Sequence, residues 1–248
     1  MVKIIISGCN GHMGRVVEAL CAADSDVEVV AGFDILGNAD HAFPVYTSPA
    51  LFDGQADAVI DFSSPAALNG LLDFAKARKI PLVLATTGYT PEQVAQIGAA
   101  ALDVPLFRSA NMSLGINVLL ELVKKAANVL GDTYDIEIVE RHHRRKVDAP
   151  SGTAHMLFNA IKEVRPNAWE NCGRAGEGKR TRDEIGVHAL RMGNVVGIHE
   201  VHINTGNQTL TLKHESGSRA MLADGAVAAA RFMEGKGNGL YDMESILG

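Results

Sequence analysis

A glycine-rich turn between an apolar strand and a helix constrains the fold of this chain more than any other feature. Gly8, Gly11 and Gly14 follow the β-branched run Val2–Ser7 and open a helix-like stretch. Glycines in such a turn permit a tight bend, let the backbone approach a pyrophosphate, and let helix and strand pack closely. An acid, Asp34, lies 20 residues beyond Gly14, where a carboxylate can bind the ribose hydroxyls of a dinucleotide. We therefore predict a dinucleotide-binding domain, with a ligand-free glycine turn as the alternative.

The first part of the chain, residues 2–112, alternates short β-branched runs with helix-like stretches. Such alternation implies a parallel sheet with helices on both faces, so the expected fold class is α/β, a Rossmann-like doubly wound domain. Pro65 and Pro91 suit the first turn of a helix, and a serine or threonine precedes each. Strands are expected at Val2–Ser7, Val27–Phe33, Ala58–Asp61, Leu82–Thr86 and Leu106–Arg108, and helices at Met13–Ala23, Pro65–Lys79 and Pro91–Leu102.

The pattern changes after residue 113. Two helices are followed by strands joined by glycine-containing turns at 192–194 and 205–207, which are typical of hairpins. We expect an α+β unit over residues 114–219 with an open mixed sheet, mostly antiparallel. A last helix, Ala220–Met233, is expected to return to the first domain, which then comprises 1–113 and 220–248. The expected elements of the second unit are helices Leu114–Leu130 and Thr153–Val164 and strands Asp135–Glu140, Val187–Arg191, Val195–Asn204 and Gln208–Glu215.

Residues 141–146 form a run of six basic side chains, two of them histidines, in a chain whose net charge is −6. A solvated charge run, a nucleic-acid surface and a small-anion site are the competing interpretations. The acidic balance and the lack of aromatic stacking partners argue against nucleic acid. Pro150 and Ser151 then begin a helix, and a helix amino terminus beside cations is typical of an anion site. We favour this site, with carboxylates bound by Lys146 and backbone amides and a proton carried by a histidine.

Neither membrane insertion nor metal binding finds support in the sequence. The chain has no run approaching the roughly 18 apolar residues of a membrane span. Cys9, Cys21 and Cys172 match no zinc or redox spacing. We expect a cytoplasmic protein that binds no metal, nucleic acid or membrane.

Over its full length the chain resembles the 4-hydroxy-tetrahydrodipicolinate reductase (dihydrodipicolinate reductase) family. The resemblance rests on the glycine turn, on Ala-Thr-Thr-Gly-Tyr at 85–89, on Ser-Ala-Asn-Met-Ser at 109–113, and on the run from His142 to Thr153. It implies reduction of 4-hydroxy-tetrahydrodipicolinate to tetrahydrodipicolinate by NADH or NADPH, in lysine and diaminopimelate biosynthesis. It also implies a homotetramer in which residues 114–219 bind the substrate and form subunit contacts.

The resemblance further implies roles for individual residues. His142 gives the proton that completes the reduction, and Lys146 holds a substrate carboxylate and shares the acid role. Substrate carboxylates are expected to bind His143, Gly152, Thr153 and Arg219. Cofactor binding is expected at Gly8, Gly11, His12, Met13, Gly14, Asp34, Ala85, Thr86, Thr87, Ser109, Ala110, Asn111 and Met112.

Two alternatives for the function stay open at this point. An amino-acid-pathway dehydrogenase of the aspartate or homoserine type would share the first domain without needing the two histidines and Lys146. A protein that senses NADH without turnover is the alternative from another class. Ile35 and Leu36 follow Asp34 with no arginine to meet a 2′-phosphate, which favours NADH, although Arg15 could serve. The strands that carry Arg191 and His199 are expected to serve packing or subunit contacts rather than chemistry.

Overall fold

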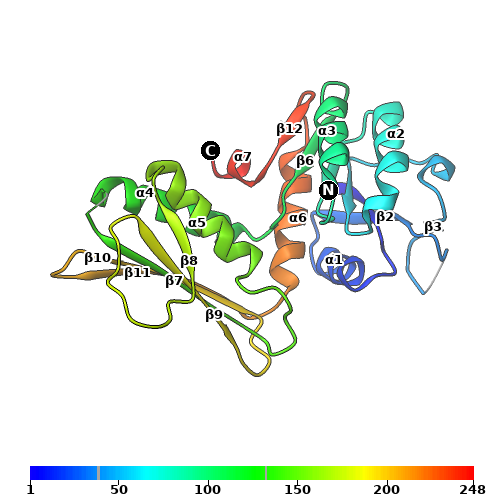
Figure 1. Cartoon of the computed structure of the whole chain (residues 1–248). Helices are drawn as coiled ribbons and strands as arrows, with labels where there is room; N and C mark the ends of the chain where they lie inside the picture. Colours follow the sequence, from blue (N-terminus) through cyan, green and yellow to red (C-terminus); the bar gives the residue numbers. More distant parts are fainter. Residues whose placement is uncertain (38–39, 132) are drawn as a thin grey trace. The chain divides into compact units, whose positions relative to one another are not determined.

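The computed structural model describes residues 1–37, 40–131 and 133–248, and these divide into two compact units (Figure 1). The first unit comprises Met1–Leu114 and Ala220–Gly248, and the second comprises Gly115–Arg219. Within the described residues, the first unit contains a seven-stranded parallel sheet and the second a five-stranded mixed sheet. No helix in the described part of the chain is long and apolar enough to span a bilayer.

The seven-stranded sheet has the order β12-β6-β5-β4-β1-β2-β3, with every neighbouring pair parallel. Its central strands are buried on both faces, which explains why most of their residues are apolar. The five strands predicted for this domain are confirmed, while the short edge strands β3 and β12 carry too few residues to give a pattern. The strands are β1 Val2–Ser7, β2 Val27–Phe33, β3 Val45–Tyr46, β4 Ala58–Asp61, β5 Leu82–Leu84, β6 Pro105–Arg108 and β12 Gly239–Tyr241.

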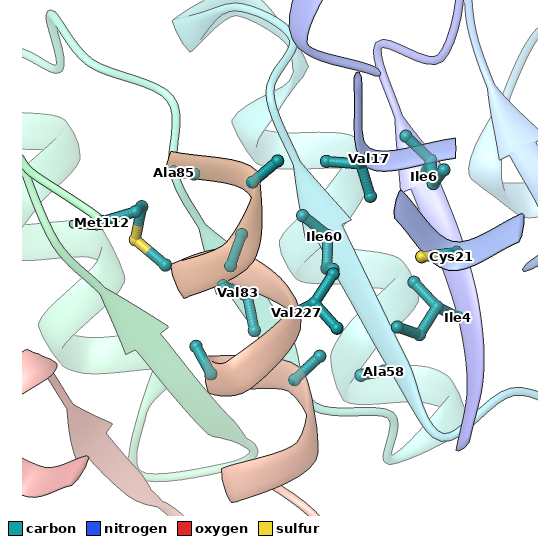
Figure 2. Close-up of a cluster of buried hydrophobic side chains, with 14 of the residues drawn as sticks. Ile4, Ile6, Val17, Cys21, Ala58, Ile60, Val83, Ala85, Met112 and Val227 are labelled. Atoms are coloured by element: carbon teal, nitrogen blue, oxygen red, sulfur yellow. The ribbon is translucent and has the colours of Figure 1, made fainter. Parts of the chain in front are cut away.

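Helices cover both faces of this sheet because alternate strand residues point to opposite sides. Ile4 and Ile6 enter an apolar cluster with α1 and α6, shown in Figure 2, whereas Ile5 enters a second cluster with α2 and α3. The last long helix, α6, packs on α1 within the first unit. The helices are α1 His12–Ala22, η1 Pro49–Leu51, η2 Pro65–Ala67, α2 Leu68–Arg78, α3 Pro91–Ala100, α6 Ala220–Phe232 and α7 Met243–Leu247.

The second unit packs helices α4 and α5 against one face of its sheet, whose order is β11-β10-β7-β9-β8. Central strand β7 alternates buried and partly exposed residues, so one face belongs to the core and the other stays polar. The elements are α4 Leu114–Leu130, β7 Asp135–His142, α5 Gly152–Val164, β8 Trp169–Cys172, β9 Glu184–Arg191, β10 Gly197–Asn204 and β11 Thr209–Ser216.

The hairpin predicted around residues 192–194 is wrong. Strands β9 and β10 do not pair with each other, because β7 lies between them, parallel to β9 and antiparallel to β10. Since β8 and β9 are also parallel, the sheet is evenly mixed rather than mostly antiparallel. The glycine-containing turn predicts that the chain reverses its direction there, but it does not predict that β7 lies between the two strands that the turn joins. The hairpin predicted at 205–207, between β10 and β11, is confirmed.

The connection between β9 and β10 crosses the carboxyl end of β7 and is joined to it by backbone hydrogen bonds. The Met192 N–H donates to the His142 carbonyl at 2.8 Å, and the Arg144 N–H donates to the Gly193 carbonyl at 3.2 Å. The charged segment that follows β7 is therefore held against the β9–β10 connection.

Candidate functional site

The first unit has a cavity of about 650 Å³ at the carboxyl ends of β1, β2 and β4. The ends of these parallel strands share one edge of the sheet, which is where open α/β sheets bind ligands. Among the described residues that line the cavity, Asp34 is the only charged one. The lining is formed by Ser7, Gly8, Asn10, Gly11, Phe33, Asp34, Ile35, Leu36, Thr47, Ser48, Pro49, Phe62, Ser63, Ser64, Ala66, Ala67, Gly70 and Leu71.

The glycine turn is too tightly packed to accept side chains. Gly8 has φ +77°, in the left-handed region, and a Cβ there would lie 2.9 Å from the Phe62 carbonyl oxygen. A Cβ on Gly14 would lie 2.2 Å from the Gly8 carbonyl oxygen, well inside contact distance. His12, Met13 and Gly14 form the first residues of α1, so the amino end of this helix follows the turn directly. The turn thus leaves backbone and a helix amino terminus for an anion.

A hydrogen-bonded chain holds the turn against the end of β2. The Asp34 carboxylate accepts the Asn10 N–H at 3.2 Å. The Asn10 amide group donates to the Gly37 carbonyl at 3.0 Å, and its oxygen lies 2.9 Å from Nε2 of His41. The other ring nitrogen of His41 lies 2.8 Å from the carboxylate of Glu18 on α1. Asn10 and His41 were not predicted, since only Asn10 stands in the motif and its partner is 31 residues away.

The loops after β5 and β6 lie at the same edge of the sheet. Ala85 and Thr86 are buried, Thr87 is exposed, and the Ser109 hydroxyl donates to the Asn111 carbonyl at 2.9 Å. The side chains of Ala85 and Met112 belong to the apolar cluster of Figure 2. Of the residues that the structure describes, none from these two loops, Ala110 included, lines the cavity.

Asp61, at the end of β4, is a fully buried acid that the sequence interpretation missed. It accepts hydrogen bonds from the N–H and hydroxyl of Ser63, at 3.1 and 2.5 Å, and from the Tyr89 hydroxyl at 3.4 Å. Burial, reinforced by the Asp61 charge, raises the pKa of Tyr89. Because Ser63 lines the cavity, Asp61 fixes part of its wall.

A nicotinamide dinucleotide fits this part of the molecule. The turn is closed to side chains and open to a ligand, the cavity has room for an adenosine, and Asp34 lies on its wall. The residues able to hold such a cofactor are therefore the glycine turn, the start of α1 and Asp34.

In the second unit, the site centres on His142 at the end of β7. Its Nδ1 lies 2.6 Å from Oε2 of Glu140, which is fully buried. The two side chains share a face of the strand because they are two residues apart. Arg191 on β9 donates to both carboxylate oxygens of Glu140 at 2.8 Å, and the Ser151 N–H donates to Oε1 at 3.1 Å. Burial alone would raise the pKa of Glu140, but hydrogen bonds from His142 and Arg191 lower it to about 2.

A second histidine, His199 on β10, lies beside His142. The ring centroids are 5.1 Å apart and the planes meet at 71°. Nε2 of His199 lies 3.0 Å from the hydroxyl of Ser151, which also caps α5 by accepting the Ala154 N–H at 3.2 Å. Burial lowers the pKa of His199 to about 4, so this ring is neutral at ordinary pH.

Cations gather around the segment that leaves His142. Nη2 of Arg219 lies 3.4 Å from Nε2 of His143. The Lys146 ammonium lies 2.8 Å from the carboxylate of Asp148, and the Lys146 N–H donates to the His143 carbonyl at 3.1 Å. Loss of hydration lowers the pKa of His143, and the charges of Arg145, Arg219, His142 and Lys146 lower it further. The structure therefore brings together four predicted catalytic and substrate-binding residues, two histidines and two cations: His142, His143, Lys146 and Arg219.

The amino end of α5 faces the same segment. Gly152 and Thr153 are its first two residues, after the Ser151 cap, and no atom lies within 4 Å of where a Gly152 Cβ would stand. The open space beside Gly152 and the positive end of the helix suit a carboxylate. The predicted substrate residues thus lie together in the second unit.

Three further residues complete the environment of His142 without having been predicted: Glu140, Arg191 and His199. The spacing of Glu140 and His142 on one strand was a usable signal, since period two places them on one face. Arg191 and His199 gave none, because each is about 50 residues away, 51 from Glu140 and 48 from Ser151. The expectation that the strands of Arg191 and His199 serve packing or subunit contacts does not account for these contacts around His142. Two arginines of the basic run bind neighbours instead: Arg141 pairs with Glu200 and Arg145 donates to Asn194.

The comparisons with known proteins cover both units. The family described as dihydrodipicolinate reductase matches with its N-terminal model at residues 2–112 and its C-terminal model at 115–247. Relatives named 4-hydroxy-tetrahydrodipicolinate reductase include one from Clostridium tetani, 42% identical over 100% of this chain and 97% of its own length. Another, from Caldanaerobacter subterraneus subsp. tengcongensis, is 46% identical over 100% of this chain and 98% of its own.

Solved structures show the same fold. A dipicolinate-bound dihydrodipicolinate reductase from Paenisporosarcina sp. TG-14 has a TM-score of 0.82 and 23% identity, covering 98% of this chain and 97% of that one. An aspartate dehydrogenase from Thermotoga maritima has a TM-score of 0.53 and 14% identity, covering 95% and 98%. At these identities the likeness concerns the fold.

Proposed function

The chain belongs to the dihydrodipicolinate reductase family, and we propose that it reduces 4-hydroxy-tetrahydrodipicolinate to tetrahydrodipicolinate with a nicotinamide cofactor. The reaction is a reductive step of lysine and diaminopimelate biosynthesis. The observation in the structure that best supports it is the cluster of His142, His143, Lys146 and Arg219 beside the amino end of α5. Neither an aspartate- or homoserine-type dehydrogenase nor a sensor of NADH is favoured, because the family match spans both units.

The first unit is assigned to the cofactor and the second to the substrate. The glycine turn and the start of α1 would hold the pyrophosphate, and Asp34 the adenosine ribose. The predicted residues after β5 and β6 would extend this contact along the sheet edge. When bound, the nicotinamide supplies the hydride.

The residues of the second unit then bind the substrate carboxylates and supply one proton. Loss of water from the hydroxylated substrate gives a conjugated imine, and hydride addition to it leaves a carbanion-like carbon that must be protonated. His142 would give that proton from Nε2, and the contact of its Nδ1 with Glu140 supports this role. Lys146 and Arg219 balance the charge of the two substrate carboxylates, and His143 and the amides at Gly152 and Thr153 bind these carboxylates by hydrogen bonds. Lys146 is also assigned a share in the acid role.

The assay that tests this proposal follows the loss of reduced-nicotinamide absorbance when the product of dihydrodipicolinate synthase is supplied. His142→Gln should lower kcat strongly, on the order of 100-fold or more, with a modest change in KM. His155→Gln, on α5 and paired with Glu170, is the matched control and should retain activity. No turnover by the native protein with either cofactor would refute the proposed activity, and near-full activity of His142→Gln would refute the proton donor.

We also assign NADH as the preferred cofactor. The cavity wall carries the Asp34 carboxylate and no other charged side chain among its described residues, which disfavours a 2′-phosphate. Asp34→Ala should weaken NADH binding more than NADPH binding, measured by initial rates with each cofactor. An equal loss for both would remove Asp34 from the ribose.

The assembly and compartment follow from the family resemblance. We propose a homotetramer, formed through the polar open face of the five-stranded sheet, and analytical ultracentrifugation tests it directly. Cytoplasmic residence fits the three cysteines, which are all unbridged in the described chain.

A further inference from the structure

The carboxylate of Glu140 is the hub of the hydrogen bonds around His142. It is fully buried and accepts four N–H groups: Nδ1 of His142, two from Arg191 and the backbone N–H of Ser151. A buried carboxylate with this many donors is ionised, in keeping with its pKa of about 2. An ionised carboxylate accepts only, so the hydrogen between it and His142 sits on Nδ1.

This fixes which nitrogen of His142 exchanges the catalytic proton. With Nδ1–H bound to Glu140, Nε2 is the atom that is protonated and deprotonated. Gly197 on β10 leaves room there, since a Cβ at that position would lie 3.1 Å from Nε2. Glu140 therefore sets the ring orientation, and the missing side chain at Gly197 keeps Nε2 approachable.

Arg191 faces Glu140 from the other side. Its two terminal nitrogens meet the two carboxylate oxygens in a side-by-side pair, and one of them also donates to the Asp148 carbonyl. The guanidinium spreads the carboxylate charge between itself and His142, so His142 does not receive the full field of an unpaired buried anion.

We propose that Glu140 and Arg191 are a positioning pair for His142, which orients the ring and sets how readily Nε2 releases its proton. The proposal rests on the role of His142 as proton donor in the proposed reaction. A bare carboxylate would hold the imidazolium proton too firmly, and no carboxylate would leave the ring unoriented.

Other charged groups surround His142 and stay constant in the comparison of variants. His199 faces it from β10, and His143 and Lys146 face it from the segment after β7. All three are cationic or neutral. Asp148, on the same segment, is paired with Lys146 at 2.8 Å, and Glu140 is the acid that contacts the His142 ring.

The test is the pH dependence of kcat in three variants. The donor must be protonated, so the rate falls as pH rises through its ionisation. Glu140→Gln removes the anion and should move this fall to lower pH by about one pH unit or more. Arg191→Gln leaves the anion unshared and should move it to higher pH. Arg191→Lys keeps the charge but loses the paired geometry, so the profile should stay in place while kcat falls.

KM, the affinity for NADH and a control variant distinguish this positioning role from a general loss of folded structure. We expect Glu140→Gln to lower kcat by roughly tenfold or more, with little change in KM or in NADH affinity. Glu200→Gln is the matched control. Glu200 lies on the neighbouring strand β10 and pairs with Arg141 of β7, and the pH profile of this variant should match the native one.

Opposite shifts in Glu140→Gln and Arg191→Gln support the pair. Unshifted profiles, or shifts in the same direction, overturn it while leaving the reductase activity intact. If Glu140→Gln does not fold, the two Arg191 variants decide alone: a profile that moves up in Arg191→Gln but not in Arg191→Lys supports the pair, and equal profiles overturn it.

Discussion

Replacing His199 should change how the stability of the second unit depends on pH. Its side chain is 4% exposed, and its Nδ1 finds no partner among the described residues. A buried imidazole without a carboxylate of its own resists protonation. In the folded protein the pKa of His199 is lowered by burial from 6.5 to about 4.

The sign and size follow from linkage. Between pH 6.5 and about 4 the unfolded chain binds a proton at His199 that the folded chain does not, so acidification favours unfolding. At about 1.4 kcal/mol for each tenfold difference in proton affinity, the loss from this residue is about 3 kcal/mol across the window. Glu140 adds a smaller loss at the low end of this window, because its pKa falls from 4.5 to about 2 and its stabilisation is lost as pH falls between these values; this loss is common to the native protein and a His199 variant.

The assay is urea denaturation at pH 7.5 and 4.5, followed through the single tryptophan, Trp169, which lies in β8 of the second unit. His199→Gln keeps an acceptor for the Ser151 hydroxyl but has no proton to gain. Between pH 7.5 and pH 4.5 the free energy of unfolding should fall in both proteins, and the fall should be about 2–3 kcal/mol smaller in His199→Gln than in the native protein. His143 and His214 have lowered pKa values too and leave a residual slope. His202→Gln, on the same strand, is the control. An identical pH dependence in native protein and His199→Gln would refute the argument.

Three further substitutions, with Gly98→Ala as a control outside both sites, probe the two sites. Gly14→Ala places a Cβ 2.2 Å from the Gly8 carbonyl and should abolish measurable cofactor binding by fluorescence titration, whereas Gly98→Ala in α3, with nothing within 4 Å, should stabilise the protein by about 1 kcal/mol. Ser151→Ala removes the α5 cap and should lower the free energy of unfolding by about 1 kcal/mol; no loss in urea denaturation would contradict the cap. Lys146→Ala should raise KM by roughly tenfold and lower kcat in initial-rate measurements, and an unchanged KM would remove Lys146 from the carboxylate.

Much of the first unit could be predicted because its signals are local. Apolar runs bounded by turns mark the strands, and Gly14 is required by a contact inside the turn, since a Cβ there would meet the Gly8 carbonyl six residues earlier. The hydrogen bonds from Asn10 to Asp34 and His41 could not be predicted, because they join residues 24 and 31 positions apart. Local sequence patterns predict which face of an element a side chain lies on, but they do not predict which distant residue it contacts.

The second unit shows the same division at the proposed proton donor. The capped helix entry at Ser151 was predicted, since capping acts over a few residues. The spacing of Glu140 and His142 was a usable signal for one strand face, but the predicted strand ended at Glu140 and β7 extends to His142. That β7 lies between β9 and β10, with Arg191 on one side of the pair and His199 on the other, is seen in the folded structure alone. Strand order depends on how whole faces pack, a sum of many weak contacts between distant segments, and no single stretch of sequence contains it.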